Sequence, residues 1–317
     1  MTASAAAGLP VLTFVVPCYN EEEVLGETSR RLLALLDELK GSVAAASSIV
    51  FVDDGSQDAT WSLIEQFRSG DARVHGIKLA RNFGHQHALL AGLMTAPGDI
   101  IISLDADLQD DLTVIPRMIE EHVKGAQIVY GVRYQRETDT WFKRTSARLY
   151  YRILRYFGVR IVPDHADFRL MSRRALETLR DFHEVNLFLR GIVPLLGFKT
   201  AIVKYQRLER FAGVTKYPFS RMLALAIDGI TSFSAVPLQW ITRIGFILAL
   251  LSVLFGFWAL VVGIYSPNRV TGWASIVTPI FFLGGLQLLA TGVIGNYIAK
   301  IYLETKQRPR FIIETSI

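Results

Sequence analysis

Two long apolar runs near the C-terminus limit what this chain can fold into. The segments from Ile244 to Tyr265 and from Ile276 to Ala299 contain no charged residue, and each reaches the roughly 20 residues that a helix needs to cross a bilayer. Arg269 is the only charged residue in the connection between them. One such run would also suit a buried core helix, but two in tandem predict a transmembrane hairpin over 241–300.

The distribution of Lys and Arg predicts how this hairpin is oriented. Basic residues lie before the first run and after the second, whereas the connection carries Arg269 alone. Because cytoplasmic flanks are enriched in Lys and Arg, we expect both chain ends and the N-terminal region to be cytoplasmic. Residues 1–10 lack the basic flank and long apolar stretch of a secretory signal, and we expect a disordered tail there. The single cysteine, Cys18, excludes an internal disulfide and suits a small buried side chain.

The first half of the chain alternates short Val- and Ile-rich runs with helical patterns. This alternation predicts βαβ units, and therefore an α/β domain with a mostly parallel sheet over 11–216. The expected strands are Leu12 to Pro17, Ile49 to Asp53, Val74 to Leu79, Ile100 to Asp105 and Ile128 to Val132. The expected helices are Glu22 to Leu39, Ala59 to Phe67, His85 to Met94 and Leu112 to Lys124.

Polar side chains follow several of these expected strands. Asp105 and Asp107 have the i, i+2 spacing that points two side chains the same way in a strand, and two neighbouring carboxylates repel unless a cation lies between them. A hard divalent cation that carries a substrate diphosphate fits this need, so the pattern favours a metal-assisted enzyme over an acidic surface turn. Ligands of such sheets bind beyond the carboxyl ends of the strands, where Asp53 and Asn20 are also expected.

Other binding chemistries lack their sequence patterns. The histidines show no zinc-site spacing, no Gly-x-Gly-x-x-Gly follows a strand, and no P-loop lysine is present. The basic residues are not interleaved with aromatic residues on a strand, which argues against nucleic-acid binding. The net charge of +5 suits contact with anionic lipid.

Two further segments have the pattern of helices at a membrane surface. Over Trp141 to Phe157, four arginines fall on one side of a helical projection and apolar residues on the other, which suits an interfacial helix or a solvated surface helix. Pro218 to Val236 is largely apolar and leads into the first run, so 217–240 is predicted to be an interfacial region. Residues 301–317 are predicted to be a cytoplasmic tail, in which Arg310 to Ile313 could add a strand to a neighbouring copy and so support a homo-oligomer, for example a tetramer.

The chain resembles the family 2 glycosyltransferases of GT-A (Rossmann-like) fold, within them the polyprenyl-phosphate glycosyltransferases related to dolichyl-phosphate mannose synthase and to bacterial undecaprenyl-phosphate glucosyltransferases. The resemblance covers nearly the whole chain and rests on six motifs in the family's order. They are Val16-Pro17-Cys18-Tyr19-Asn20-Glu21, Val52-Asp53-Asp54-Gly55-Ser56, Arg81-Asn82-Phe83-Gly84, Asp105-Ala106-Asp107-Leu108-Gln109-Asp110, Ala166-Asp167-Phe168-Arg169-Leu170-Met171 and Arg210-Phe211-Ala212-Gly213-Val214-Thr215-Lys216-Tyr217. Two positions depart from it: Asp111-Leu112 replaces a common Pro-Pro pair, and His85 follows Gly84 where Lys or Glu is usual.

The resemblance implies a role for each acidic residue. Asp53 would accept a hydrogen bond from the imide N–H of the nucleobase, and Arg81 would help to hold the base or its ribose. Asp105 would bind ribose hydroxyls, and Asp107 would ligate Mg²⁺ or Mn²⁺ on the diphosphate. The nucleotide pocket would also be lined by main-chain groups around Pro17, Tyr19 and Glu21. The structural alternative for Asp53 is a carboxylate that caps the helix after it.

Asp167 is the candidate catalytic residue by the same resemblance. A carboxylate in this motif is proposed as a base in related enzymes, yet an ionised phosphate hardly needs deprotonation, so an orienting role is equally open. Pairing with Arg169 is the structural alternative. The basic residues Arg210 and Lys216 could screen the charge of an acceptor phosphate, or anchor the chain to lipid headgroups unspecifically.

The resulting hypothesis is an inverting, metal-dependent transfer of a hexose to undecaprenyl phosphate at the cytoplasmic face of a bacterial inner membrane. UDP-glucose is the expected donor, with GDP-mannose, a UDP-N-acetylhexosamine or a UDP-aminoarabinose derivative as alternatives. A processive polysaccharide synthase is disfavoured, because Gln239 is followed directly by Trp240 and only two spans are expected. A nucleotide-sugar sensor or a scaffold for a flippase is the non-catalytic alternative.

Overall fold

The computed structural model describes residues 8–134, 165–185, 187–206, 231, 234–265 and 273–317. The chain forms two compact units. The first combines Met1–Tyr151, Arg160–Pro218 and Gln307–Ile317, and the second combines Arg152–Val159 and Phe219–Lys306.

The first unit is built on one eight-stranded sheet with the order β7-β5-β6-β4-β1-β2-β3-β8. Pairing is parallel except where β6 meets β4 and β5 and where β8 meets β3. The strands are β1 (Leu12–Cys18), β2 (Ser48–Asp53), β3 (Val74–Leu79), β4 (Ile100–Ser103), β5 (Ile128–Tyr134), β6 (His165–Ser172), β7 (Thr200–Gln206) and β8 (Ile313–Ser316). The helices of this unit are α1 (Leu25–Glu38), α2 (Thr60–Gly70), α3 (His85–Thr95), η1 (Leu112–Val114), α4 (Ile115–Val123), α6 (Arg173–Arg180), α7 (Leu189–Ile192) and η2 (Val193–Leu196).

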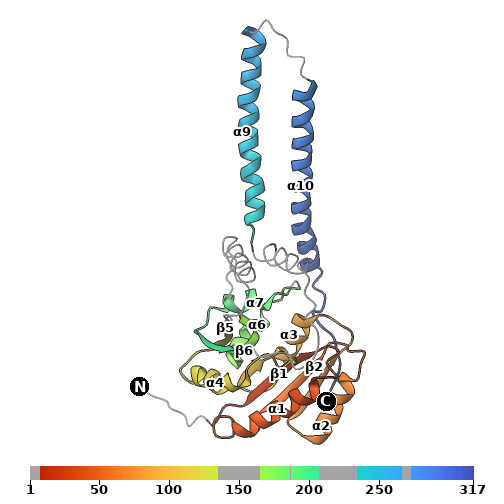
Figure 1. The fold of residues 1–317 in the computed structure, drawn as a ribbon, viewed down its shortest axis with the longest axis vertical. Coiled ribbons are helices and arrows are strands. Elements are labelled where there is room, and N and C mark those ends of the chain that lie inside the picture. The colour runs from red at the N-terminus through yellow and green to blue at the C-terminus, as the bar shows by residue number, and fades with distance from the viewer. Residues whose placement is uncertain (1–7, 135–164, 186, 207–230, 232–233, 266–272) are drawn as a thin grey trace. The chain divides into compact units, whose positions relative to one another are not determined.

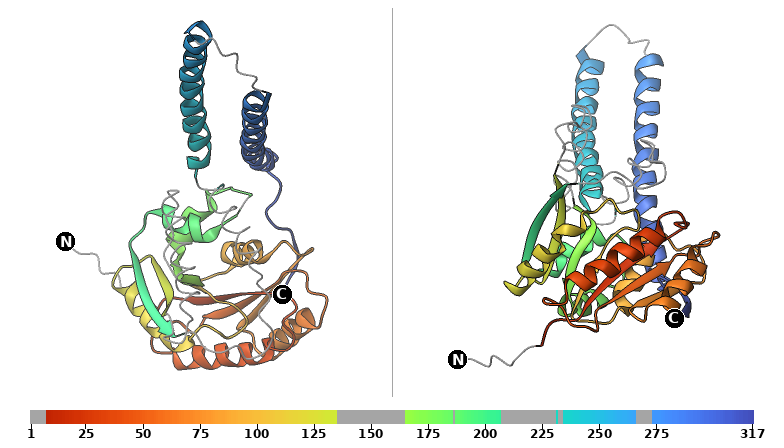
Figure 2. Two further views of the ribbon diagram at one scale, coloured as in Figure 1. Left: turned by 45° about the horizontal axis from the view of Figure 1, so that its top comes forward. Right: turned by 60° about the horizontal axis from the view of Figure 1, so that its bottom comes forward.

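Helices cover both faces of the sheet, which is why its central strands are apolar on both sides (Figure 2). Phe14 and Val16 belong to the core that α1, α2 and α4 form on one face. On the other face α3 packs closely enough that a Cβ at Gly92 would lie 2.4 Å from Val15 and 2.8 Å from Val52. The carboxyl ends of β4, β1, β2 and β3 therefore meet at one edge between two helical layers.

The register of β6 brings a further segment to this edge. β6 runs antiparallel to β4, with Ile102 paired to Leu170 and Ser103 paired to Arg169. The end of β4 therefore lies next to the beginning of β6. The beginning of β6, with Asp167, thus lies at the edge where the loop with Asp105 follows β4. Because side chains alternate along a strand, Asp167 and Arg169 also share one face of β6.

The five strands expected from the sequence are all present, and they form parallel pairs with one another where they are adjacent. One boundary matters for the site: β4 was expected to continue to Asp105, but it ends at Ser103. Asp105 and Asp107 therefore lie in a loop, and the prediction that a strand points both side chains the same way is wrong. The expected helix from Leu112 begins as the short η1 turn, because Asp111 accepts a hydrogen bond from the Thr113 N–H and fixes that start.

Three strands were not predicted. β6 and β7 carry charged residues at positions where the central strands are apolar, and β8 is short and mostly exposed. The C-terminal segment was predicted to be a tail that could extend the sheet of a neighbour. Instead, β8 pairs antiparallel with β3 of its own chain, with Ile317 packed on the core and Glu314 paired with Lys78 at 3.2 Å.

The second unit contains two long helices, α9 (Val236–Tyr265) and α10 (Trp273–Thr305), which run side by side (Figure 1). The Tyr297 hydroxyl of α10 donates to the Ser234 carbonyl just before α9, at 2.6 Å. By length and composition, one helical stretch of the described residues, Phe282–Thr305, could cross a membrane, and Val236–Leu248 is a shorter apolar stretch. The expected basic helix 141–157 and almost all of the approach helix 218–236 lie outside the described residues.

We expect removal of residues 311–317 to expose β3. The amides of Gly76 and Ala80 donate to Ile317 and Ile312 respectively, so both lose their partners with the truncation. Hydrogen exchange should become faster in a peptide covering 76–80 and stay unchanged across β2.

Glu314→Gln is the matched control, because it breaks only an exposed ion pair that is worth about 1 kcal/mol or less. Equal exchange at 76–80 in the truncated and complete chains would contradict the pairing.

Candidate functional site

The loop after β4 is fixed by contacts of its later residues, Leu108 and Asp110. Leu108 is buried and has a φ of 56°, a conformation that costs energy for a side chain other than glycine. Asp110 is 2% exposed and accepts hydrogen bonds from Arg133 of β5, at 3.1 Å, and from Tyr205 of β7. The loop is therefore tied to two other strands.

Asp105 lies in this loop with a carboxylate that is poorly compensated. Its Oδ1 atom is buried and has no hydrogen-bond partner in the described part of the chain, the closest cation being His85 Nε2 at 3.6 Å. Burial raises the pKa of Asp105 to about 6; His85 opposes the rise, and the carboxylates of Asp110, Asp167 and Asp107 add to it. Asp107 accepts a hydrogen bond from the Gln109 N–H at 3.2 Å. This loop thus concentrates negative charge that would be relieved by a cation.

Asp53 and Asp54 are adjacent and buried, but the structure uses them differently. Asp54 accepts hydrogen bonds from the amides of Phe83 and Gly84 at 2.7 and 2.9 Å, so both of its oxygens fix the turn that starts α3. Asp53 accepts one bond from Ser56, and its Oδ2 finds no partner among the described residues. Burial raises the pKa of both carboxyls. Asp53 bonds to a turn that ends before α2 begins, which disfavours the helix-cap alternative.

The turn that carries Arg81 touches the turn after Asp53. Gly55 has a φ of 71°, and a Cβ there would lie 2.6 Å from the Arg81 carbonyl carbon, so glycine is required on both counts. Arg81 itself is exposed, and its guanidinium lies 4.0 Å from the ring centroid of Phe83. It lies at the same edge as Asp53, on the solvent side.

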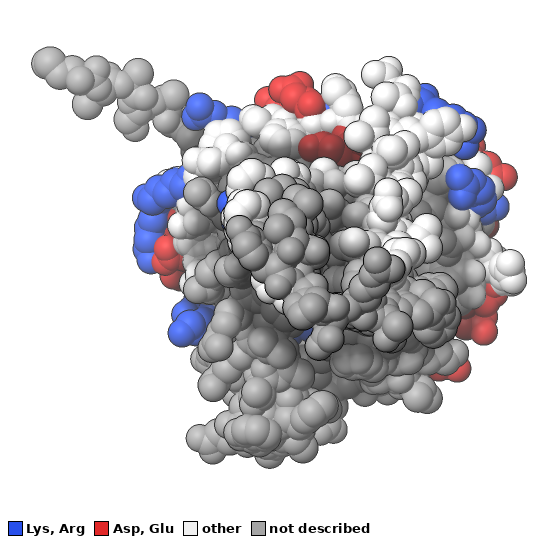
Figure 3. Space-filling view, turned by 90° about the horizontal axis from the view of Figure 1, so that it is seen from above, with Lys and Arg blue, Asp and Glu red and all other residues white. Residues whose placement is uncertain are grey.

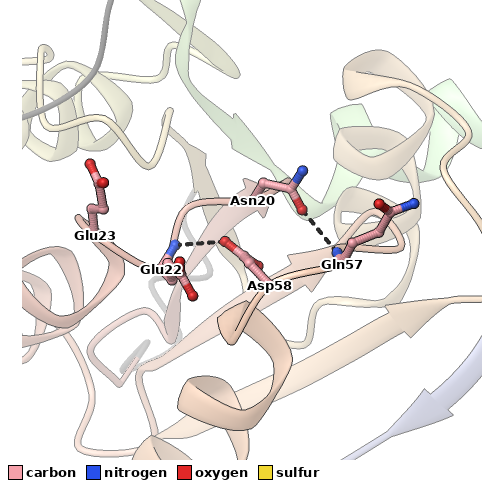
Figure 4. Close-up of a pocket in the computed structure, with 5 residues that line it drawn as sticks. All are labelled: Asn20, Glu22, Glu23, Gln57 and Asp58. Carbon is pink, nitrogen blue, oxygen red and sulfur yellow. Dashed lines mark hydrogen bonds between the residues drawn. The ribbon is translucent and has the colours of Figure 1, made fainter.

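The loop after β1 forms a third side of this edge. Pro17 is buried in β1, Tyr19 is 43% exposed, and the Glu21 amide donates to Thr60 at 2.9 Å. Figure 4 shows a shallow depression beside this loop, lined by Asn20, Glu22, Glu23, Gln57 and Asp58. Hydrogen bonds from Gln57 to Asn20 and from Glu22 to Asp58 join the two loops across it. Its acidic lining does not suit an anionic ligand.

Asp167 is the most heavily bonded carboxylate of the site. Its side chain is 3% exposed and accepts hydrogen bonds from Arg169 of β6 and from His85 and Gln86 of α3, both at 3.2 Å. Arg190 of α7 adds an ion pair at 3.1 Å. Burial alone would raise the pKa of Asp167, but the His85 hydrogen bond and the charges of Arg190 and Arg169 hold it well below its ordinary value. The pairing with Arg169 that the sequence allowed is therefore present, together with Arg190 and the His85 imidazole.

Three side chains of this cluster were not assigned a role from the sequence. His85 was noted only as a departure from the family pattern, and Gln86 and Arg190 were not identified. Gln86 also accepts a hydrogen bond from the Leu189 amide at 3.1 Å, which fixes the start of α7 against α3. The departure at His85 was the one available signal, because Arg190 is 23 residues from Asp167 in sequence and only the fold joins them.

The two cations expected to bind the acceptor, Arg210 and Lys216, lie outside the described residues. On the face shown in Figure 3, charged side chains of both signs are interspersed around the rim. The charged groups that define the candidate site are therefore the buried clusters around Asp105 and Asp167 at the strand ends.

The acidic loop fits a divalent cation on its chemistry. The Asp107 carboxylate is a hard oxygen ligand of the kind that Mg²⁺ and Mn²⁺ prefer, and the Asp105 oxygen without a partner among the described residues adds negative charge that a cation would offset. No group of three His, Cys, Asp or Glu side chains that could hold a metal occurs within the described ranges. A cation here would therefore need ligands from a bound substrate, as a diphosphate provides.

Comparisons with known proteins identify the family of this chain. The family described as Glycosyl transferase family 2 matches residues 13–180. An uncharacterized glycosyltransferase of Bacillus subtilis, YkoT, is 51% identical over 312 residues, which are 97% of this chain and 92% of that protein. The bactoprenol glucosyl transferase of Shigella phage SfX is 42% identical over 305 residues, 96% of this chain and 99% of its own length. Among solved structures, mannosyl-3-phosphoglycerate synthase from Rubrobacter xylanophilus covers 74% of this chain and 75% of its own, with a TM-score of 0.47 and 15% identity.

We expect Asp54→Ala to destabilise the protein much more than Asp53→Ala. The first change leaves the Phe83 and Gly84 amides without their partner, which costs about 2–4 kcal/mol, whereas the second removes one bond and a partly unsatisfied buried charge. Thermal unfolding of both variants measures the difference. Equal losses of stability in the two variants would contradict a structural role for Asp54 that Asp53 does not share.

We expect Asp105→Asn to stabilise the metal-free protein at pH 7.5. The folded pKa of about 6 lies above the ordinary 3.8, so the ionised form is penalised in the folded state. This penalty, about 1–3 kcal/mol, is complete above pH 6 and disappears as the pH falls toward 4.

The variant's gain in melting temperature, measured with a chelator, should therefore shrink between pH 7.5 and pH 5. Asp111→Asn, in the same loop, is the matched control for the loss of a carboxylate, because asparagine also caps the η1 turn. A gain for Asp105→Asn that grows on acidification would contradict the assignment.

Proposed function

Because this chain belongs to glycosyltransferase family 2, we propose that it transfers glucose from UDP-glucose to a polyprenyl phosphate such as undecaprenyl phosphate. The acceptor is supported by a relative named bactoprenol glucosyl transferase, which aligns over 99% of its length. The geometric observation that carries the proposal is the acidic loop of Asp105 and Asp107, which has an oxygen with no partner among the described residues and follows β4 at the same edge of the sheet as Asp53.

The donor would bind along the carboxyl ends of β1, β2 and β4. Asp53 Oδ2 is oriented by the Ser56 bond to its other oxygen and would accept from the imide N–H of uracil. Asp105 would accept from ribose hydroxyls, and Arg81 would lie over the nucleoside from the solvent side. Main-chain groups of Pro17, Tyr19 and Glu21 would complete the pocket.

Asp107 would ligate Mg²⁺ or Mn²⁺ on the diphosphate. When bound, the cation neutralises charge that develops on the leaving nucleoside diphosphate. The chain's own residues orient the donor, and the acceptor phosphate displaces the diphosphate at the anomeric carbon. A single displacement inverts that carbon and needs no covalent intermediate on the protein.

We also propose that α9 and α10 form the transmembrane hairpin. Its apolar length and the Lys and Arg residues outside both spans support a cytoplasmic site at the inner membrane, where Arg210 and Lys216 would meet the lipid phosphate. An oligomer and a flippase that takes the product are further proposals with no contact to support them.

The test is synthesis of a lipid-linked sugar by the purified full-length chain. Labelled UDP-glucose, undecaprenyl phosphate and Mg²⁺ should give a chloroform-soluble product, and Asp107→Ala should reduce its rate by at least about a hundredfold because the diphosphate loses its cation. Asp111→Asn is the control from the same loop, because asparagine also caps the η1 turn.

Failure of every nucleotide sugar to label lipid would overturn the transferase proposal in favour of a sensor or scaffold. Labelling from GDP-mannose or a UDP-N-acetylhexosamine in place of UDP-glucose would correct the donor. A product that grows by repeated addition would identify a processive synthase.

A further inference from the structure

Two basic side chains at the edge of the sheet, His85 and Arg190, share one buried carboxylate. The Asp167 side chain is 3% exposed, whereas those of His85 and Arg190 are 45% and 40% exposed. Each of these side chains bonds to Asp167 and remains partly exposed. Arg169 binds the same carboxylate but is 0% exposed, so it cannot reach a ligand.

We propose that Arg190, held in place by Asp167, binds phosphoryl oxygens of a substrate, and that Asp167 is a positioning residue with no part in proton transfer. The proposal rests on the proposed function, because it concerns the phosphates of that reaction. It adds one phosphate-binding residue and decides between the two roles that the sequence left open for Asp167.

The ligand chemistry follows from the side chain and its place. An arginine guanidinium presents several N–H donors in a planar fork, which matches the oxygens of a phosphate. Asp105 lies 3.6 Å from His85, and His85 lies 3.2 Å from Asp167, so Arg190 is linked through Asp167 and His85 to the loop expected to hold the diphosphate. An anionic acceptor that approaches a second phosphate group needs a cation at this position.

The contacts of Asp167 argue against a role as a base. Its Oδ1 accepts from Arg169 and from Arg190 Nε at 3.4 Å, and its Oδ2 accepts from His85, Gln86 and Arg190 Nη2. A carboxylate that accepts N–H donors on both oxygens is a weak base, and the low pKa of Asp167 agrees with this.

The reaction also balances without a base. An ionised phosphate oxygen of the acceptor forms the new bond to the anomeric carbon, while the bond from that carbon to the diphosphate oxygen breaks. The bonding electrons leave with the nucleoside diphosphate, and no proton is transferred.

The first experiment separates the two phosphates by kinetics of the full-length enzyme. Arg190→Gln should raise KM at least about tenfold for the substrate whose phosphate it binds, and Arg190→Lys should raise it less because the charge remains. A rise for undecaprenyl phosphate identifies the acceptor as the ligand, and a rise for UDP-glucose identifies the donor diphosphate. Arg117→Gln, an exposed arginine on α4, is the matched control with wild-type kinetics expected. Both KM values within twofold of wild type in Arg190→Gln would overturn the proposal.

The second experiment tests whether Asp167 acts through Arg190. If it does, Asp167→Asn combined with Arg190→Gln should be about as impaired as the worse single variant. A base that acts independently of Arg190 would instead give multiplied losses, with Asp167→Asn lowering kcat and leaving KM unchanged. That result would overturn the positioning role. Melting temperatures show which variants are folded. The KM measurements on Arg190→Gln still test the proposal even if Asp167→Asn does not fold.

A third arm does not need turnover. Calorimetric titration of wild type and Arg190→Gln with UDP plus Mg²⁺, and separately with farnesyl phosphate, should show weaker binding of one ligand by the variant. If wild type makes no lipid-linked sugar, the proposed function fails, while weakened binding still supports the phosphate site. Equal binding of both ligands by the two proteins would overturn it.

Discussion

Unequal compensation of buried charge organises this site. Both Asp167 and Asp105 contact His85, yet Asp167 also binds Arg169 and Arg190. Asp105 has the His85 imidazole at 3.6 Å, and the nearby carboxylates of Asp110, Asp167 and Asp107 add to the cost of its negative charge. A compensated carboxylate stabilises its surroundings, and an uncompensated one is a cost that a bound cation or hydroxyl donor can remove. Compensated carboxylates such as Asp167 therefore stabilise the structure of the site. Uncompensated ones such as Asp105 remain able to bind a ligand.

The same division holds for the adjacent pair on β2. Asp54 uses both oxygens on the turn at Phe83 and Gly84, and Asp53 keeps one oxygen unsatisfied within the described structure. The loop of Asp105 is likewise fixed by a different carboxylate, Asp110, through Arg133 and Tyr205. In both places one carboxylate, Asp54 or Asp110, fixes the backbone, and a second one, Asp53 or Asp105, keeps an oxygen that can bind a ligand. The site is therefore preorganised before any substrate binds.

The sequence predicted the parallel half of this architecture and the acidic edge, because apolar strands buried on both faces produce a strong local pattern. It did not reveal β6, β7 or β8, whose charged or exposed positions weaken that pattern. Motif reading found Asp53 and Asp167, but their bonding depends on contacts made across the fold, such as Gly55 against Arg81 and Arg190 against Asp167. No local signal encodes such contacts. The end of β4 at Ser103 was missed because the apolar run continues through Leu104.

The position of Arg169 limits what loss of activity at Asp167 can mean. Arg169 is fully buried, and its Nε and Nη1 atoms have no hydrogen-bond partner among the residues described, so Asp167 supplies its principal compensation. Removing the negative charge would leave a buried cation unpaired, which is strongly destabilising whatever the chemistry of the site. Loss of activity on substitution of Asp167 is therefore expected whether Asp167 acts as a base or stabilises the structure. Only the dependence of its effect on Arg190 distinguishes the two, because proton abstraction would not need that arginine and positioning would.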